Sequence, residues 1–390
     1  MKRVMLVFGT RPEAIKMAPV VRALRESPRH QPIVVVTAQH REMLDQVLDL
    51  FGIEPDHDLD VSRPRQGLAQ LTGRALDRLA PLMTQEQPDA VIVQGDTTTT
   101  LVGALAAFYA GVPVVHMEAG LRTGNATNPF PEEMNRRLTT RLASLHLAAT
   151  ARARQNLLSE GVLPADVIVT GNTVIDALLW AINQDRPCVD PLLAACESHP
   201  GQVVLVTTHR RESWGPPMSR VAAAVAELAR RHPSVLFALP LHRNPVVHEA
   251  VVPAVAGIAN VALGEPADYW SFARLMQRAH ILLTDSGGVQ EEGPSLGKPV
   301  LVTRDTTERP EAVDAGVARL VGTDTRRIVA AVETLLVDSS AHASMANAVN
   351  PYGDGHAAQR TVRSLDRLLV GTAHVQEFAP VDRLPALAKV

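Results

Sequence analysis

The chain of 390 residues lacks the features that define several large protein classes. It has only two cysteines, Cys188 and Cys196, which cannot form a disulfide framework or a four-thiolate metal site. No apolar run approaches the roughly 20 residues that a helix needs to cross a bilayer. The apolar residues 4–8 are followed at once by Arg11 and Glu13, so they are interpreted as a first β-strand rather than a signal peptide. We therefore expect a protein of the cytoplasm that does not enter a membrane.

Two further absences concern nucleic acids and common cofactors. The chain has 41 acidic and 38 basic residues, a formal net charge of −3. This argues against a general nucleic-acid binder, because affinity for phosphates needs concentrated positive charge. No G-x-G-x-x-G sequence opens a predicted helix, and no G-x-x-x-x-G-K-[ST] sequence occurs. The sequence thus counts against a nicotinamide-dependent enzyme and against a P-loop NTPase.

What the sequence does contain is a regular alternation of short apolar runs and longer amphipathic stretches. The runs are rich in Val and Ile and are flanked by polar, Gly or Pro residues, which is typical of strands buried on both faces. In chain order they lie at residues 4–8, 33–36, 90–93, 112–115, 167–169, 203–206, 235–239, 281–283 and 300–302. Strand–helix alternation over a whole chain predicts a parallel α/β architecture.

A break in this rhythm divides the chain into two predicted domains. The segment 183–201 carries three prolines, and a new strand starts directly after it. We predict a first domain at residues 1–172, completed by a C-terminal helix at 359–370, and a second domain at 173–358. Residues 371–390 have little periodicity and are expected to be a partly disordered tail. In open parallel sheets ligands bind at the carboxyl ends of the strands, so the loops after the strands are the place to look for chemistry.

Three carboxylates of the first domain stand at strand ends or helix starts. Asp96 follows the third apolar run, Glu118 follows the fourth, and Glu132 opens a helix. An acid at such a position is commonly only a cap or a partner of the helix dipole. The recurrence of acids at one edge of the same domain indicates instead that they gather in a site. Arg11 and Lys16, after the first run, either face that site or are solvated at a plain helix start.

The second domain carries a predicted phosphate site after the eighth apolar run. Ser286, Gly287 and Gly288 stand at a helix N-terminus, where free N–H groups and the helix dipole attract an anion. Glu292, one turn further, would repel phosphate but could accept hydrogen bonds from two ribose hydroxyls. This combination predicts binding of a nucleoside diphosphate. His209, which follows the sixth run beside two arginines, is consistent with an anion site or with a plain surface loop.

Seven motifs in chain order resemble the non-hydrolysing UDP-N-acetylglucosamine 2-epimerases of bacteria. They are GTRPE, QGDTTTT, HMEAGLRT, FPEEMNR, THRRE, TDSGGVQEE and RDTTERPE. The resemblance runs from about residue 3 to residue 369. It implies a fold like the GT-B glycosyltransferases, with two Rossmann-like domains facing across a cleft, a last helix crossing back to the first domain, and a homodimer. It further implies interconversion of UDP-GlcNAc and UDP-ManNAc in the cytoplasm, without nicotinamide, another cofactor or an obligatory metal.

The resemblance also implies roles for individual residues. The nucleotide would be bound by Arg11, Phe272, Ser286, Gly287, Gly288, Glu292 and Arg309, with Phe272 near the uracil. The sugar and diphosphate would be surrounded by Lys16, Asp96, Glu118, Glu132, Arg136 and His209, of which the three acids and His209 are the expected catalytic set. A second, allosteric site for UDP-GlcNAc would use Gln39, His40, Glu42, Arg65, Arg210 and His242. Glu42 stands where we would expect glutamine, which predicts a weaker allosteric effect.

The expected reaction explains the need for several carboxylates. The proton on C2 of the sugar is scarcely acidic, because C2 bears an acetamido nitrogen and has no neighbouring carbonyl. Breaking the C1–O bond to UDP acidifies it, and loss of the proton gives 2-acetamidoglucal. UDP must be held as it leaves, one carboxylate must take the proton, and a second acid must serve the opposite face. We rank the base on the GlcNAc side as Asp96, then Glu118, then Glu132; which acid serves which face stays open.

Three other functions remain open at this point. A hydrolysing 2-epimerase that releases ManNAc would share the first chemical step. A UDP-sugar glycosyltransferase of the same fold would share the nucleotide site but would need an acceptor groove where the three acids stand. A non-catalytic sensor of nucleotide sugars would have no need for acids beside C2.

Overall fold

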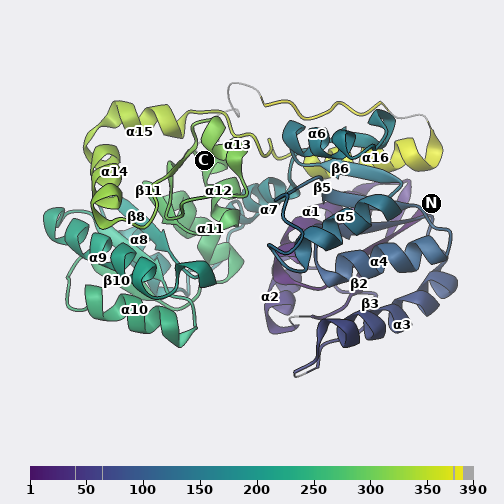
Figure 1. Cartoon of the computed structure of the whole chain (residues 1–390), viewed down its shortest axis with the longest axis horizontal. Coiled ribbons are helices and arrows are strands. Elements are labelled where there is room, and N and C mark those ends of the chain that lie inside the picture. The colour runs from purple at the N-terminus through teal and green to yellow at the C-terminus, as the bar shows by residue number, and fades with distance from the viewer. Residues whose placement is uncertain (40, 64, 372–373, 381–390) are drawn as a thin grey trace. The chain divides into compact units, whose positions relative to one another are not determined.

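The chain folds into two α/β units (Figure 1). The computed structural model describes residues 1–39, 41–63, 65–371 and 374–380. Unit 1 consists of Met1–Ala177 and Tyr352–Ala379, and unit 2 is built on Leu178–Pro351. All strand pairs in both units are parallel, with every strand assigned within the described residues. The predicted α/β class is therefore confirmed.

Unit 1 contains a seven-stranded sheet in the order β3-β2-β1-β4-β5-β6-β7. The strands are β1 (Lys2–Phe8), β2 (His30–Val36), β3 (His57–Asp58), β4 (Ala90–Gln94), β5 (Val114–Ala119), β6 (Leu145–Ala148) and β7 (Val167–Val169). The central strand β1 pairs through Leu6 with Val34 on one side and Ile92 on the other. All three side chains are buried, which explains why these strands are continuous apolar runs in the sequence.

Helices cover both faces of the unit 1 sheet. They are α1 (Arg11–Glu26), α2 (Arg41–Phe51), α3 (Leu68–Glu86), α4 (Thr98–Tyr109), α5 (Glu132–Leu142), α6 (Ala151–Ser159) and α16 (Ala357–Val370), with α7 (Thr173–Ile182) at the end of the first chain segment and a short 3₁₀ turn η1 (Pro164–Asp166). Helices α3, α4 and α5 pack in series on one face, and α1 packs between α2 and α16 on the other (Figure 1). The carboxyl ends of β1, β4 and β5 are thereby left to loops.

The segment Tyr352–Ala379 belongs to unit 1, so the chain returns to this unit after unit 2. The Asp176 carboxylate accepts hydrogen bonds from the backbone N–H groups of Ala357 and Ala358 at the start of α16, at 3.3 and 2.8 Å. Beyond this helix, the N–H of Phe378 donates to the carbonyl of Val169 at 2.7 Å, and the Phe378 ring is buried. Residues 374–379, within the segment expected to be partly disordered, are thus held by an aromatic anchor. Residues 372–373 and 381–390 of that segment lie outside the described residues.

Unit 2 contains a six-stranded sheet in the order β10-β9-β8-β11-β12-β13. The strands are β8 (Val203–Thr207), β9 (Leu236–Pro240), β10 (Val261–Gly264), β11 (Ile281–Thr284), β12 (Val300–Val302) and β13 (Ala318–Leu320). The helices are α8 (Pro191–Ser198), α9 (Pro216–Arg231), α10 (Pro245–Val255), α11 (Tyr269–Arg278), α12 (Gly287–Glu292), α13 (Pro310–Asp314), α14 (Thr325–Val337) and α15 (Ser339–Ala346), with 3₁₀ turns η2 (Arg211–Ser213) and η3 (Gly293–Leu296).

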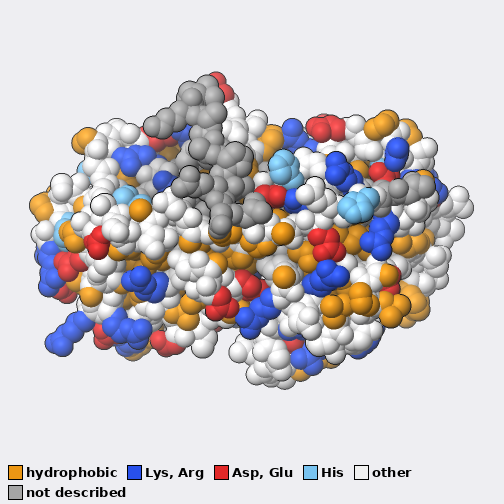
Figure 2. All heavy atoms as spheres, turned by 90° about the horizontal axis from the view of Figure 1, so that it is seen from above, with side chains coloured by type: hydrophobic (Ala, Val, Ile, Leu, Met, Phe, Trp, Pro, Cys, Tyr) orange, Lys and Arg blue, Asp and Glu red, His pale blue; other side chains and the backbone are white. Residues whose placement is uncertain are grey.

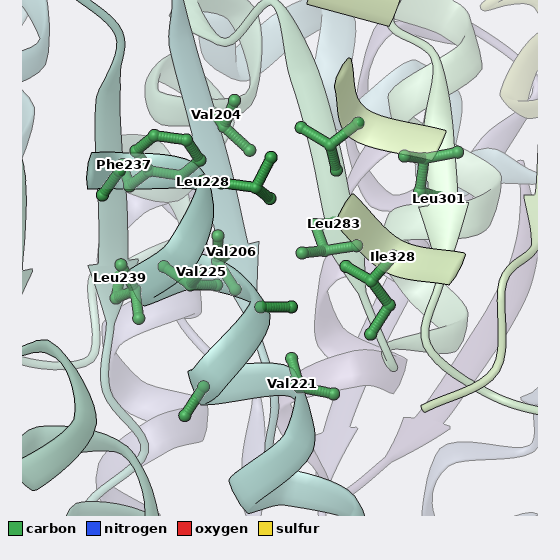
Figure 3. Packing of buried hydrophobic residues seen from close by; sticks show 14 of the residues in the cluster. Val204, Val206, Val221, Val225, Leu228, Phe237, Leu239, Leu283, Leu301 and Ile328 are labelled. Atoms are coloured by element: carbon green, nitrogen blue, oxygen red, sulfur yellow. The ribbon is translucent and has the colours of Figure 1, made fainter. Parts of the chain in front are cut away.

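The core of unit 2 lies between its sheet and helix α9. Val221, Val225 and Leu228 follow the helical spacing that places them on one face of α9, and all are buried. They pack with Phe237 of β9 and Ile328 of α14 (Figure 3). Complete burial of one such side chain contributes about 1.5–3 kcal/mol. The sheet edge that carries the loops after β8 and β11 is therefore anchored on a rigid layer.

Candidate active site

Glu118 is held by three donors from three different parts of unit 1. Its Oε1 lies 2.5 Å from Nζ of Lys16, on α1. The same oxygen accepts a hydrogen bond from Nδ2 of Asn172 at 3.0 Å, and Oε2 accepts one from Nε2 of Gln94 at 2.6 Å. The carboxylate side chain is 14% exposed, so it is largely but not completely shielded from water.

The backbone at Glu118 is unusual for a strand residue. Its φ is 56°, in the left-handed region that non-glycine residues rarely occupy. The register between β5 and β6 shifts between Met117 and Ala119, so Glu118 sits in a bulge. Bulges re-aim a side chain, and strained backbone of this kind concentrates at functional sites. Glu118, predicted to follow the strand, lies within it.

Asp96 follows β4 and is held from α5. Its Oδ2 lies 2.6 Å from Nη2 of Arg136 and accepts a hydrogen bond from Nε of the same residue at 2.9 Å. Asn135 donates to the Asp96 carbonyl at 2.9 Å. The preceding Gly95 has a φ of 71°, and a Cβ added there would lie 3.5 Å from Oε2 of Glu118. The turn at Asp96 therefore lies beside the Glu118 carboxylate.

The two acids that open α5 behave differently. Glu132 makes no ion pair or side-chain hydrogen bond with any residue that the structure describes. Glu133 is fully buried and accepts hydrogen bonds from the N–H of Thr123 and from Arg136, both at 3.1 Å, and from Arg137 at 3.0 Å. Burial alone would raise the pKa of Glu133, but these hydrogen bonds outweigh it and lower the pKa. Glu133, which the sequence analysis did not select, fixes the arginine that holds Asp96.

Glu13 is a second supporting acid that the sequence analysis did not select. It is buried, and its Oε2 accepts hydrogen bonds from the N–H groups of Gly9 and Thr10 at 3.0 and 2.8 Å. Its Oε1 accepts one from the Thr97 hydroxyl at 2.6 Å. Burial raises the pKa of Glu13, against the effect of these hydrogen bonds. Glu13 thus ties the loop after β1 to the loop after β4; the capping-box spacing of Thr10 and Glu13 could have indicated the first of these contacts.

In unit 2, the turn at the start of α12 lies against Arg309. A Cβ added to Gly287 would lie 2.8 Å from Cζ of Arg309, so only glycine allows the guanidinium to lie this close. Nε of Arg309 donates to Glu291 at 2.8 Å, and Nη1 donates to Glu308 at 2.8 Å. At Gly288 an added Cβ would meet Oε2 of Glu292 at an ordinary contact distance of 3.4 Å. The predicted cradle and its cation are therefore adjacent.

Glu292, predicted to bind ribose, is buried in unit 2. The hydroxyl of Tyr269, at the start of α11, donates to its Oε1 at 2.8 Å. Phe272, predicted to lie near the uracil, is half-buried on the same helix. Tyr269 was not selected from the sequence, because a tyrosine at a helix start carries no motif of its own.

His209 lies after β8 and faces the buried Asp285. Nδ1 of His209 lies 3.2 Å from Oδ1 of Asp285, whose side chain has no solvent exposure. The ring of His242 is stacked on the His209 ring, with centroids 6.0 Å apart. Burial and the nearby His209 lower the pKa of His242. Asp285 was not selected from the sequence.

Five of the six residues proposed for the allosteric site are described. In unit 1, Gln39 is half-buried and its Oε1 has no hydrogen-bond partner, while Glu42 and Arg65 are exposed. In unit 2, Arg210 is half-buried, 3.9 Å from a carboxylate oxygen of Glu308, and His242 is exposed. The sixth, His40, lies outside the described residues.

Within residues 1–39, 41–63, 65–371 and 374–380, no three His, Cys, Asp or Glu side chains are grouped so as to hold a metal ion. Over the same ranges, none of the helices combines the length and the apolar character that a membrane span requires.

Two parallel α/β units with charged loops at their strand ends define the class of this protein, which is the GT-B-like class of enzymes that act on nucleotide sugars. The model of the UDP-N-acetylglucosamine 2-epimerase family matches residues 22–366, and the chain belongs to this family. The predicted resemblance is confirmed.

Individual relatives agree with the family. The chain is 54% identical over 370 residues to a UDP-N-acetylglucosamine 2-epimerase of Yersinia pestis, covering 93% of this chain and 98% of the relative. A crystal structure of UDP-GlcNAc 2-epimerase from Neisseria meningitidis bound to UDP-GlcNAc matches with a TM-score of 0.84 and 47% identity, over 93% of this chain and 99% of that one. The Methanocaldococcus jannaschii enzyme in complex with UDP-GlcNAc and UDP matches with a TM-score of 0.76 and 31% identity, over 93% and 99%.

Proposed function

We propose that this enzyme interconverts UDP-GlcNAc and UDP-ManNAc by elimination of UDP to 2-acetamidoglucal and re-addition. The observation that carries the proposal is the pair of carboxylates at the sheet edge of unit 1, each paired with a cation: Glu118 with Lys16 and Asp96 with Arg136. Acids arranged for proton transfer suit a reaction in which the C2 proton is removed and replaced. The relatives named above support UDP-GlcNAc as the substrate.

Asp96 is our choice for the base that takes the proton from UDP-GlcNAc. Arg136 binds its Oδ2, whereas its Oδ1 makes no hydrogen bond with the described residues. Both oxygens of Glu118 already accept hydrogen bonds, so neither is as available as Oδ1 of Asp96 to take the C2 proton. Glu118 and Glu132 are the candidates for the second acid, which protonates C2 from the opposite face.

We infer that cationic groups and N–H donors stabilise the negative charge that develops on the departing UDP. In unit 2 these are His209, Arg309 and the turn of Ser286, Gly287 and Gly288. In unit 1 they are Arg11 and Lys16. Donors aimed at developing charge commonly make the largest single contribution to catalysis. Glu292, fixed by Tyr269, is assigned to the ribose.

Product analysis separates this reaction from the alternatives. Incubation with UDP-GlcNAc alone, read by NMR, should give UDP-GlcNAc and UDP-ManNAc at a stable ratio with the diphosphate intact. Accumulation of free ManNAc and UDP would mean a hydrolysing epimerase. Turnover only after addition of a sugar acceptor would mean a glycosyltransferase, and binding without turnover would mean a sensor.

We also propose a homodimer formed through α4 and α5. Phe108 and Tyr109 at the end of α4 are 56% and 68% exposed, and Leu138 of α5 is 46% exposed. Figure 2 shows hydrophobic side chains gathered on the surface of unit 1. Apolar side chains collected on one face mark interaction sites on soluble proteins. Sedimentation should give twice the chain mass for the wild type and a monomer for Tyr109→Glu; a wild-type monomer would contradict the assignment.

We propose that the enzyme acts in the cytoplasm. We also propose that UDP-GlcNAc bound at a second site regulates it. The residues assigned to this site are Gln39, His40, Glu42, Arg65, Arg210 and His242. Glu42 accepts hydrogen bonds but cannot donate one, and its charge repels a diphosphate. We therefore expect coupling near the low end of the roughly 1–3 kcal/mol typical of allosteric pairs. Stimulation of UDP-ManNAc turnover by trace UDP-GlcNAc, stronger in Glu42→Gln, would support this; full-speed turnover of UDP-ManNAc alone would contradict it.

A further inference from the structure

We propose that Asp285 is a positioning residue that fixes the tautomer of His209, so that Nδ1 carries the ring proton and Nε2 is left for the ligand. The effect of this on turnover rests on the proposed function. The tautomer itself does not, because it follows from contacts within unit 2.

One oxygen of Asp285 is fully occupied by the loop after β8. Oδ2 accepts hydrogen bonds from the backbone N–H groups of His209 and Arg210, at 2.9 and 3.0 Å, and from the Thr208 hydroxyl at 3.2 Å. The two loops are brought together by the sheet, in which Thr284 of β11 is paired with Thr207 of β8. Asp285 therefore cannot rotate without breaking three contacts at once.

The other oxygen, Oδ1, is buried and lacks a satisfying hydrogen bond from the residues that the structure describes. Nδ1 of His209 lies 3.2 Å from it. A buried acceptor without a donor is destabilising, so a small rotation of the ring that places an N–H on Oδ1 is favoured. Because Nδ1 is the ring nitrogen that faces Oδ1, the neutral ring then carries its proton on Nδ1 and presents Nε2 as an acceptor.

The neighbours of His209 favour contact between a ligand and the side of the ring that carries Nε2. The His209 side chain is 40% exposed whereas the Asp285 side chain has no exposure, so the ring, unlike the carboxylate, is open to a ligand. Nε1 of Trp214 donates to the His209 carbonyl at 3.4 Å, and the His242 ring is stacked alongside. The contact with His209 and the hydrogen bonds to Oδ2 hold the pKa of Asp285 below its usual value, although burial acts in the opposite direction.

The arrangement gives His209 two useful states. With Nδ1 protonated and Nε2 free, the ring accepts a hydrogen bond; with both nitrogens protonated, Nε2–H donates to an anion while Asp285 stabilises the imidazolium charge. A carboxylate that orients a histidine in this manner acts through the tautomer and does not itself take up the proton. In the proposed reaction the donating state faces the leaving diphosphate, and the C1–O electron pair ends on that diphosphate.

The decisive variant is Asp285→Asn. Its amide oxygen can keep the backbone hydrogen bonds of Oδ2, so its NH₂ group must face Nδ1 of His209. Nδ1 then becomes an acceptor and the proton moves to Nε2. We expect ¹⁵N NMR of the imidazole to show protonated Nδ1 in the wild type and protonated Nε2 in the variant. We expect kcat to fall by about 10²–10⁴-fold, the usual effect of a positioned acid or base, with UDP affinity nearly unchanged.

Two controls separate positioning from a merely structural role. Asp190→Asn makes the same substitution at a carboxylate of unit 2 that accepts backbone N–H groups, of Leu192 and Leu193, and should leave kcat unchanged. In a His209→Gln background, Asp285→Asn should cost almost nothing further, because its effect passes through the missing ring.

The outcomes are distinct. A wild-type ring protonated on Nε2, unchanged kcat in Asp285→Asn, or multiplying effects in the double variant would each overturn the proposal. The wild-type NMR measurement decides the tautomer even if Asp285→Asn does not fold. If the wild type does not epimerise UDP-GlcNAc, the proposed function fails while the NMR result still tests the role of Asp285.

Discussion

In unit 1 the acid of the Asp96–Arg136 pair is the more exposed partner, whereas in unit 2 the base is the more exposed partner of the His209–Asp285 and Arg309–Glu291 pairs. The Asp96 side chain is 26% exposed against 6% for its partner Arg136. The His209 side chain is 40% exposed against none for Asp285, and Arg309 is 13% exposed against 5% for Glu291. Two sheets of similar topology thus present opposite groups at their loop edges.

In the proposed function, this difference gives each unit a different task. In the proposed epimerisation, an exposed carboxylate fixed by a buried cation is the group that exchanges protons. In the proposed binding of UDP, an exposed base held by a buried carboxylate keeps its orientation toward the anion. The supporting partner also fixes the side chain, so catalysis and binding do not depend on flexible surface residues.

The largest effect should come from the acids of unit 1. Asp96→Asn and Glu118→Gln should each lower turnover by about 10²–10⁴-fold, the range for removal of a positioned acid or base. Glu132→Gln should fall in the same range if Glu132 is the second acid. UDP affinity, measured by calorimetry, should change little, because the nucleotide is assigned to unit 2. A single variant with near-normal turnover would remove that residue from the catalytic set.

Loss of the Glu13 carboxylate should be the next largest effect, on stability. Glu13→Ala leaves the buried N–H groups of Gly9 and Thr10 without an acceptor, which should cost about 2–4 kcal/mol in the free energy of unfolding. Glu13→Gln retains an acceptor and should cost less. Urea denaturation measures both, with Glu26→Ala at the exposed end of the same helix as the control. Equal stability of Glu13→Ala and Glu26→Ala would show that the link between the two loops is unimportant.

Lowering the pH should reduce the stability of unit 1, because two of its histidines are buried. Burial lowers the pKa of His116 to about 3 and that of His146 to about 4. The unfolded chain titrates near pH 6.5, so on acidification it takes up protons before the native state does, and stability falls below that pH. Between pH 7 and pH 5 the loss is about 2 kcal/mol for each histidine. His146→Leu should therefore lose about 2 kcal/mol less over this interval than the wild type; identical losses would contradict the assignment.

The smallest expected effect is on UDP affinity, and it distinguishes Gly287 from Gly288. Gly287→Ala forces its Cβ against Arg309, whereas Gly288→Ala meets only ordinary contacts in the free protein. We expect Gly287→Ala to weaken UDP binding by about tenfold, which is 1.4 kcal/mol. Gly288→Ala serves as the matched control for the displacement of Arg309. Equal losses in both variants would mean that backbone approach of the ligand, and not Arg309, sets the affinity.

Much of the fold followed from the apolar runs, and the exceptions have physical causes. All nine runs overlap strands of the two sheets. Four strands were missed. Strand β3 has only the two polar residues His57 and Asp58, and β6 and β13 are short sequences interrupted by His146 and Arg319. The residues of β10 are only partly buried. The fourth run predicted the start of β5 but not its extension through Glu118, because a bulge with left-handed backbone leaves no local signature in the sequence.

From the sequence, the side chains expected to touch the substrate were easier to predict than the residues that hold those side chains in place. Asp96, Glu118 and the turn at Ser286 stand in motifs next to strands. Asn172 is 54 residues from Glu118, and Thr97 is 84 residues from Glu13, so only the folded chain brings these partners together. Acids such as Glu133 and Glu13 look like ordinary residues of a first helical turn until their buried partners are known.

In the proposed reaction the C2–H bond breaks during turnover without a redox step, and exchange of the C2 hydrogen for deuterium measures whether it does. With enzyme and UDP-GlcNAc alone in D₂O, NMR should show deuterium at C2 in both recovered UDP-GlcNAc and the UDP-ManNAc formed. The elimination route requires this exchange, because the base that takes the C2 proton is open to solvent between turnovers. Retention of the original hydrogen at C2 in UDP-ManNAc through many turnovers would contradict the account.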